Sequence, residues 1–235
     1  MDDRILAFIK AVRKPFSNSF LEGNLYFNTL EYFNQIEKED DNIGDYFDGA
    51  IAYSEDKVSM TLFSLESEKV IKINDVENLK ISRNSYFNMF CLYSIWESDC
   101  IRTDGGLYIH NIEKEFIKKF NEHDFYIIER PNNFIEKIQS IIIKEATDKN
   151  LCKHLSKGIV KYKKRNKEIN SELEFPFFIK REKYKYQKEF RFVLEETKDN
   201  KPIVIKFENI SDFVTRLRNP NNPLKFIEPY MKMRE

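Results

Sequence analysis

The sequence has few of the residues that build disulfide frameworks or zinc sites. Its three cysteines, Cys91, Cys100 and Cys152, form no CxxC motif. An odd number of scattered cysteines is typical of a reducing compartment and not of a disulfide-stabilised secreted domain. The three histidines are equally scattered, so a zinc site would need ligands from distant segments. We therefore predict a cytoplasmic protein that holds no metal.

Long apolar runs, an excess of one charge and flexible linkers are also lacking. No segment approaches the roughly 20 apolar residues of a membrane span, and the acidic start is unlike a signal peptide. The 39 basic and 39 acidic residues balance, which excludes a protein whose whole surface binds nucleic acid. No internal repeat or Gly/Ser-rich linker interrupts the chain. We predict a single α+β domain over residues 1–235 that does not bind a membrane.

Aromatic residues are plentiful, with 21 Phe and 12 Tyr, and they predict a Phe-rich core. The most continuously apolar segment, Tyr86–Trp96, is expected to be a central strand covered on both faces. The apolar run Ile5–Val12 fits either a helix or a strand. Short strand candidates between Ala50 and Ile81 resemble an antiparallel meander. Helices are expected from Pro131 onward and over Asp212–Leu217.

This order of elements predicts an α+β fold with a twisted, mainly antiparallel sheet and flanking helices, since the short strands follow one another without regular helices between them. The expected core includes Phe27, Phe90, Leu92, Phe190 and Phe192.

The clearest strand pattern, Lys183–Glu195, also gathers polar side chains. Alternation puts Gln187, Glu189 and Arg191 on one side and mostly apolar residues on the other. Such a row is either a solvated face or the floor of a polar cleft. Because charged residues mostly lie in water, spacing alone favours the solvated face.

Two aspartates lie in the loop Gly44–Gly49, where glycines allow unusual backbone angles. Asp45 and Asp48 could hold a cation, but the spacing lacks the further ligands of a calcium loop, so a plain loop is expected. A nuclease using magnesium would require the fold to bring Asp45, Asp48 and Glu189 together.

Several short motifs follow one another along the chain. They are Leu25–Phe33, Asp48-Gly49, Asn88–Ser94, Val160-Lys161-Tyr162 and Tyr184–Val193. In this order they resemble a large group of bacterial and phage proteins of uncharacterised function. The resemblance spans most of the chain and implies no activity by itself.

A remoter resemblance does imply an activity. Gln187-Lys188-Glu189 resembles the Gln-x-Glu signature of ADP-ribosyltransferases, in which the second residue is the catalytic acid and the first orients the acceptor. The resemblance implies NAD as substrate, Glu189 as the group that stabilises the cationic ribose and Gln187 as the acceptor-side residue. A fixed carboxylate suits the developing positive charge of glycosidic bond cleavage.

The sequence departs from the family in its NAD-binding set. The family's Ser-Thr-Ser-like segment is missing, so Asn28-Thr29 or Ser94 would have to replace it, and Arg13 is only a candidate for the early-strand arginine. The residues that the resemblance implies for NAD binding are Arg13, Tyr26, Asn28, Ser94 and Arg191.

The function expected on this basis is an NAD-dependent ADP-ribosyltransferase or NAD glycohydrolase. Its partners would be a nucleotide or small-molecule ligand and a protein or nucleic-acid acceptor, and it would act as a toxin, a phage-defence factor or a counter-defence factor. The alternative is a non-catalytic module that binds a nucleotide or a protein in phage–host conflict, because the catalytic set is incomplete and Tyr and Phe suit contact surfaces.

Overall fold

The computed structural model describes residues 3–39, 45–54, 57–63, 70–77, 79–82, 85–103, 106–109, 112–163, 170–171, 176–217 and 224–226. The chain divides into two compact units. Unit 1 comprises residues 1–29, 86–159 and 186–235, and unit 2 comprises residues 30–85 and 160–185. The single domain expected from the sequence stays a prediction. No helix among the described residues is both long and apolar enough to cross a membrane.

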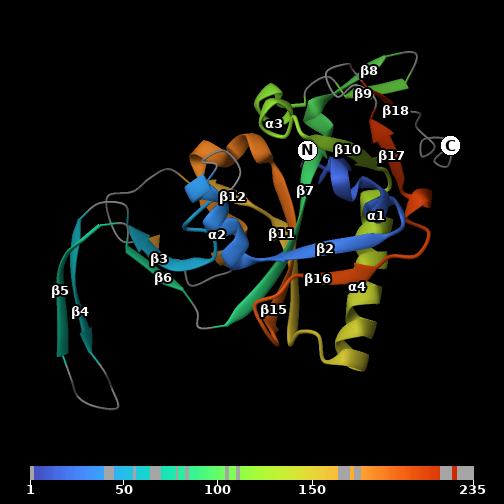
Figure 1. Ribbon diagram of the computed structural model, residues 1–235. Coiled ribbons are helices and arrows are strands. Elements are labelled where there is room, and N and C mark those ends of the chain that lie inside the picture. The colour runs from blue at the N-terminus through green and yellow to red at the C-terminus, as the bar shows by residue number, and fades with distance from the viewer. Residues whose placement is uncertain are drawn as a thin grey trace. The chain divides into compact units, whose positions relative to one another are not determined.

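Unit 1 is built on a twisted sheet whose main order is β11-β15-β7-β1-β10-β17, with every pair in this order antiparallel (Figure 1). Its strands are β1 (Ile5–Arg13), β2 (Asn24–Thr29), β7 (Tyr86–Trp96), β8 (Cys100–Thr103), β9 (Gly106–Ile109), β10 (His123–Ile128), β11 (His154–Ile159), β15 (Glu189–Thr197), β16 (Ile203–Lys206), β17 (Val214–Leu217) and β18 (Leu224–Phe226). Its helices are α1 (Ser17–Leu21), α3 (Lys114–Lys119) and α4 (Pro131–Lys149), with short 3₁₀ turns η1 (Lys14–Phe16), η2 (Glu97–Asp99) and η5 (Ile210–Asp212). The expected α+β class with a mainly antiparallel sheet is confirmed.

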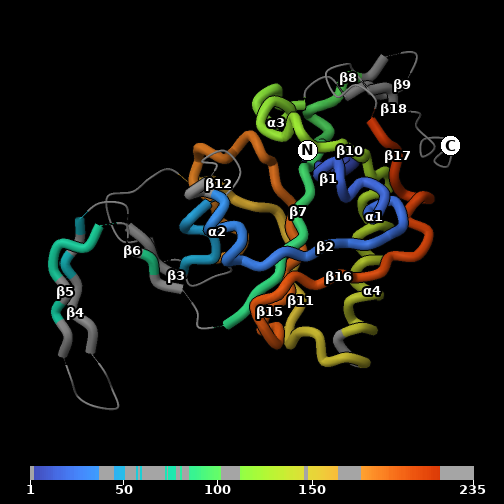
Figure 2. The backbone as a smooth tube through the Cα atoms, in the orientation of Figure 1, coloured from blue at the N-terminus to red at the C-terminus, as the bar shows by residue number. Residues whose placement is uncertain are grey.

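Strand β7 is the centre of this sheet, as expected from its apolar sequence. One edge pairs with β15 along nearly its whole length. The other edge is shared, because β2 pairs with Asn88 and Met89 whereas β1 pairs with the segment Tyr93–Trp96. The colours in Figure 2 show that β7, β15 and β1 come from distant parts of the chain. Backbone hydrogen bonds from three strands therefore converge on β7.

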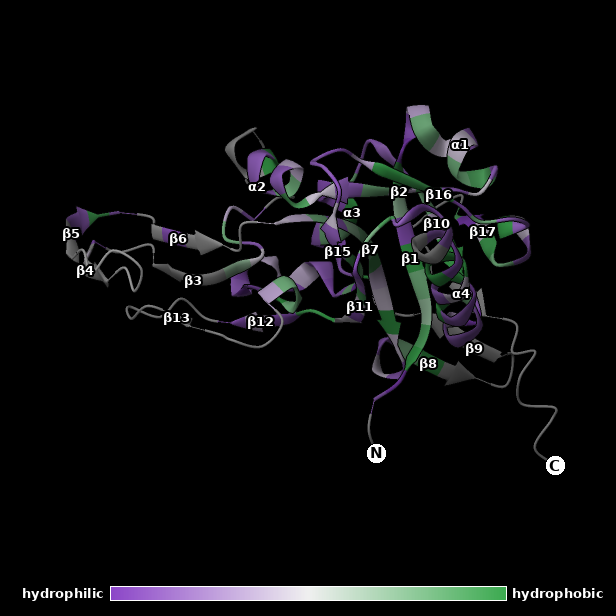
Figure 3. Cartoon of the chain, turned by 90° about the horizontal axis from the view of Figure 1, so that it is seen from below, coloured by the Kyte–Doolittle hydropathy of each residue, from purple (hydrophilic) through white to green (hydrophobic). Residues whose placement is uncertain are grey.

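The core of unit 1 lies between one face of the sheet and α4, which contacts β1, β11 and β16. Pro131 is the first residue of α4, as predicted, and Phe134, Ile138 and Ile142 are fully buried on one side of the helix. Figure 3 shows hydrophobic colouring along much of β1, one of the strands that α4 contacts. The five core residues expected from the sequence all belong to this cluster, namely Phe27, Phe90, Leu92, Phe190 and Phe192.

In its described residues, unit 2 consists of small sheets and one amphipathic helix. It contains α2 (Leu30–Glu39), β3 (Ala50–Ser54), β4 (Val58–Phe63), β5 (Val70–Val76), β6 (Leu79–Ser82), β12 (Lys161–Lys163), β13 (Asn170–Ser171), η3 (Pro176–Phe178) and β14 (Ile179–Arg181). Strand β3 pairs with β6, and β4 pairs with β5, so the four strands are nested and do not form the expected meander. Strands β12 and β14 pair in parallel.

Two further expectations are wrong. The segment Glu182–Gln187 forms a 3₁₀ turn, η4, so the strand expected from Lys183 begins only at Glu189. The helix expected over Asp212–Leu217 is instead the end of η5 followed by β17, which pairs with β10 at the sheet edge. In both places tertiary context overrides a short local pattern.

The side chain of Asn88 on β7 joins three strands of unit 1. Its buried side chain donates from Nδ2 to the carbonyls of Phe27 (3.2 Å) and Lys201 (2.8 Å), and its Oδ1 accepts from Thr197 Oγ1 (2.9 Å). Replacing Asn88 by Leu leaves these groups unsatisfied, which should lower the free energy of unfolding by about 2–4 kcal/mol. Urea unfolding checks this value. The control, Asn133→Ala on the exposed side of α4, should change it by less than about 0.5 kcal/mol; equal effects would contradict the role of Asn88.

Candidate functional site

The polar row of β15 is an ion pair buried in unit 1. Arg191 Nε lies 2.6 Å from Glu189 Oε2, with the arginine side chain 1% exposed and the glutamate side chain 10% exposed. Arg191 Nη1 also lies 3.9 Å from Met89 Sδ. The two residues share a face, as strand alternation predicted, but the expectation that this face is solvated is wrong. Other elements cover it, which strand periodicity cannot reveal.

Gln187 ends η4, one residue before the strand β15. Its side chain is buried, and Nε2 donates a hydrogen bond to the hydroxyl of Tyr186 (3.3 Å). Lys188 separates it from Glu189 and has a left-handed backbone, with φ of 38°. The carbonyl of Lys188 accepts the backbone N–H of Ser94 at 2.8 Å. The Gln-x-Glu signature therefore spans a kink between a 3₁₀ turn and a strand.

Strand register decides which predicted NAD-binding residues share a face with Glu189. Glu189 lies opposite Tyr93, and Ile9 on β1 also lies opposite Tyr93. Alternation from Ile9 puts Arg13 on the same face, about 13 Å further along β1. Arg13 is exposed there.

Asn28 also belongs to the Glu189 face, since it pairs with Met89, which alternates in step with Tyr93. Its Oδ1 accepts the backbone N–H of Thr29 at 3.0 Å, so part of its polar capacity is used locally. Arg191 and Asn28 are therefore brought to one face with Glu189, and Arg13 lies at the far end of that face.

Ser94 lies on the other face. It follows Tyr93, so its side chain is on the opposite face of β7, where its fully buried Oγ has no hydrogen-bond partner among the described residues. Tyr26 alternates in step with Asn28 and so belongs to the Glu189 face, about 7 Å further along β2. It is 52% exposed and pairs with Val204 on β16, beyond the part of β2 that joins β7.

Lys10 is a charged residue of this region that the sequence reasoning missed. Its Nζ donates to the carbonyl of Cys91 at 2.9 Å, between the segments of β7 that pair with β2 and with β1, and lies 4.3 Å from the Phe90 ring centroid. Burial lowers the pKa of Lys10, while charges at Cys91 and Glu189 oppose that shift. The available signal was a lone lysine inside the apolar run Ile5–Val12.

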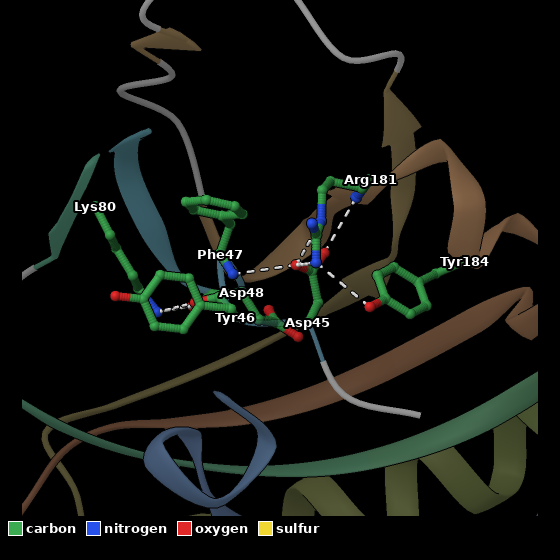
Figure 4. Close-up of polar contacts among 7 residues, drawn as sticks. All are labelled: Asp45, Tyr46, Phe47, Asp48, Lys80, Arg181 and Tyr184. Carbon is green, nitrogen blue, oxygen red and sulfur yellow. Dashed lines mark hydrogen bonds and ion pairs between the residues drawn. The ribbon is translucent and has the colours of Figure 1, made fainter. Parts of the chain in front are cut away.

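Unit 2 contains a second buried ion pair, in the loop considered for metal binding (Figure 4). Asp45 Oδ1 accepts from Arg181 Nε (2.9 Å), Arg181 Nη2 (2.8 Å) and the N–H of Phe47 (3.0 Å). Arg181 also donates to the hydroxyl of Tyr184 at 3.3 Å, and its guanidinium carbon lies 5.0 Å from the Phe47 ring centroid. The cation held by Asp45 is thus a side chain of the protein.

Lys80 completes this arrangement by donating from Nζ to the carbonyls of Tyr46 and Asp48 (Figure 4). Within the described parts of the chain, no group of three or more His, Cys, Asp or Glu side chains is placed to hold a metal ion. The contacts of this loop are therefore structural contacts within unit 2.

Comparisons with known proteins provide no further assignment: no family model, no curated protein and no solved structure matches this chain.

His123, the first residue of β10, lies near several positively charged side chains. Arg13 is its cross-strand neighbour, and the ring packs against Phe120 at 5.1 Å between centroids. Burial lowers the pKa of His123 to about 4, with the charges of Arg13, Lys10 and Lys14 adding to the shift. The imidazole is therefore neutral in the folded protein at neutral pH.

This shift predicts a pH-dependent stability. The unfolded state binds a proton at His123 near pH 6.5 but the folded state only near pH 4, so stability should fall as the pH drops from about 6.5 to about 4. In His123→Gln this contribution should be missing. Urea midpoints at pH 7 and pH 5 for both proteins check the difference; parallel losses in the two proteins would contradict it.

Proposed function

We propose that the chain is an NAD-dependent ADP-ribosyltransferase or NAD glycohydrolase with an ADP-ribosyltransferase-like fold in unit 1, acting in the cytoplasm. The observation that carries the proposal is the fixed Glu189 carboxylate at the start of a central strand, two residues after Gln187. The resemblance of Gln187-Lys188-Glu189 to the family signature supports the assignment of roles. Arg191 orients the carboxylate through its 2.6 Å contact.

The proposed chemistry is heterolytic cleavage of the bond between ribose C1′ and the nicotinamide nitrogen of NAD. Both bonding electrons leave with nicotinamide, and the positive charge moves from the pyridinium ring to the ribose. The Glu189 carboxylate stabilises that cation electrostatically. An acceptor group or water then forms the new bond to C1′ and releases its proton to solvent. Gln187 orients the acceptor.

Other residues of the same face supply the remaining interactions that NAD requires. Arg13 is an exposed cation at the far end of the face, and it fits the pyrophosphate charge. Asn28 contributes an amide for ribose or nicotinamide hydrogen bonds. Ser94 takes no part in this arrangement, because register puts its side chain on the face of β7 opposite Glu189. Tyr26, on the same face as Asn28 and further along β2, offers an exposed aromatic ring and hydroxyl to the nucleotide.

A second candidate function is a non-catalytic module that binds a nucleotide or a protein. The low exposure of the Glu189 side chain and its pairing with Arg191 favour it, since a catalytic carboxylate must be reached by its substrate. Such a module would be stabilised by its ligand, by about 2.7 kcal/mol at 100 times the dissociation constant. A rise in melting temperature with NAD, without nicotinamide release, would support this function over the transferase.

Glu189→Gln tests the transferase directly. Loss of the charge should reduce nicotinamide release by a factor on the order of 100 to 1,000. Because Arg191 then lacks its buried partner, the variant should also lose about 3–5 kcal/mol of stability. Nicotinamide release is measured per folded protein, at a temperature where both proteins remain folded.

The matched control for this loss of stability is Asp45→Asn, which removes the other buried carboxylate paired with an arginine. It should be destabilised similarly but release nicotinamide at the wild-type rate. A folded Glu189→Gln protein with wild-type release would end the transferase proposal, as would a wild-type protein that releases none.

Gln187→Ala should separate transfer from NAD cleavage. Because Gln187 is assigned to the acceptor, its loss should reduce ADP-ribose transfer to lysate acceptors about tenfold or more while nicotinamide release changes less. Both products are quantified in one reaction with labelled NAD. Equal losses of both products would show that Gln187 serves the cleavage step or the fold.

A further inference from the structure

Lys188, between the two signature residues, has an unusual backbone conformation. Its φ of 38° lies in the left-handed region, which a long non-glycine side chain rarely adopts. Such residues persist only where their surroundings fix them, and they are enriched at functional sites. The question is what holds Lys188 in this conformation.

The side chain and the carbonyl of Lys188 are both anchored within unit 1. Its Nζ lies 2.7 Å from Asp99 Oδ1 and 3.5 Å from Glu113 Oε1. Its carbonyl accepts the N–H of Ser94 at 2.8 Å. Lys188 is thus tied to β7, to η2 and to the residue before α3. We call the three side chains of Lys188, Asp99 and Glu113 the lysine clamp.

The lysine clamp is linked to the residues around Glu189. Asp99 also accepts the backbone N–H of Trp96 at 3.0 Å through Oδ2. The N–H of Glu113 donates to the hydroxyl of Tyr93 at 3.2 Å, and Tyr93 is the cross-strand partner of Glu189. Burial raises the pKa of this Tyr93 hydroxyl. The lysine clamp is therefore connected by hydrogen bonds to β7 and, through Tyr93, to the start of β15.

The ion pair within the clamp is less exposed than an ordinary surface pair. The Lys188 side chain is 21% exposed and the Asp99 side chain 7%. Screening by water is therefore weaker than for the exposed pairs that contribute little to stability. The lysine clamp can therefore stabilise the left-handed backbone conformation of Lys188, which a lysine rarely adopts.

We propose that Lys188 is a positioning residue, whose clamped left-handed backbone sets where Gln187 lies relative to Glu189. The inference rests on the proposed transferase function. In an unbroken strand the two side chains would project from one face about 7 Å apart. With Lys188 left-handed, Gln187 ends a 3₁₀ turn and Glu189 begins the strand. Gln187 is assigned to the acceptor and Glu189 to the ribose cation. The distance between these two side chains thus depends on the backbone conformation of Lys188.

The test compares Lys188→Met with Lys188→Arg and with Lys153→Met. Methionine keeps an unbranched side chain without the charge, and arginine restores a cation. Lys153 also pairs with a glutamate at 2.7 Å, through Glu196, but its side chain is 68% exposed, so it is the matched control. Each protein is measured for Ser94 amide exchange, for the Gln187 side-chain amide resonance and for kcat and KM of nicotinamide release.

In Lys188→Met we expect Ser94 exchange to accelerate about tenfold and the Gln187 resonance to shift. The kcat should fall by about 10- to 100-fold with little change in KM. Lys188→Arg should recover most of each change, and Lys153→Met should match the wild type. If Lys188→Met does not fold, Asp99→Asn removes the charge while keeping an acceptor for Trp96, and the same readouts are taken.

Wild-type Ser94 exchange and an unshifted Gln187 resonance in Lys188→Met would overturn the inference, whatever the activity. So would a loss of kcat that only follows a loss of folded protein. Absence of nicotinamide release from the wild type overturns the proposed function and is read from a different measurement, so the two failures are distinguishable.

Discussion

The sheet of unit 1 depends on the hydrogen bonding of one strand. One edge of β7 pairs with β15 from Tyr86 to Tyr93, and the other edge is divided between β2 and β1. Buried backbone N–H and C=O groups must be hydrogen-bonded. The part of β7 between the segments paired with β2 and with β1 therefore needs another hydrogen-bond partner. Lys10 meets that need at Cys91, by donating a side-chain hydrogen bond to the carbonyl. The cost is a cation taken largely out of water, which the lowered pKa of Lys10 reflects.

Each unit also contains a buried arginine–carboxylate pair, Arg191–Glu189 in unit 1 and Arg181–Asp45 in unit 2. Burying two charges is expensive, and apolar residues of similar size often give equal or greater stability. The pair in unit 2 is explained by its contacts, since Asp45 also organises the turn at Phe47. The pair in unit 1 lies on β15 directly after Gln187 and Lys188, with Glu189 as the first residue of the strand. That position in the Gln-x-Glu signature is why Glu189 is the better candidate for chemistry.

Much of the fold could be predicted from the sequence because local residue patterns specify its main elements. The apolar run Tyr86–Trp96 identified the central strand, Pro131 marked a helix start, and alternation put Glu189 and Arg191 on one face. The errors arise where distant segments decide. The burial of Glu189 depends on what covers the strand, and the kink at Lys188 depends on Asp99 and Glu113. Neither partner is visible in the local pattern around residue 188.

The pairing of β7 with β15 has a consequence for how the chain folds. Tyr93 and Glu189 meet although they are roughly a hundred positions apart in the sequence. Such a large sequence separation between paired residues slows folding. The entropy cost of closing the long loop comes before the stabilising contacts between the strands can form. During synthesis β7 emerges well before β15, whereas β4 and β5 of unit 2 pair with each other over a short loop. An early chain therefore presents an apolar strand with an unpaired edge, which is a risk for aggregation until the C-terminal strands arrive.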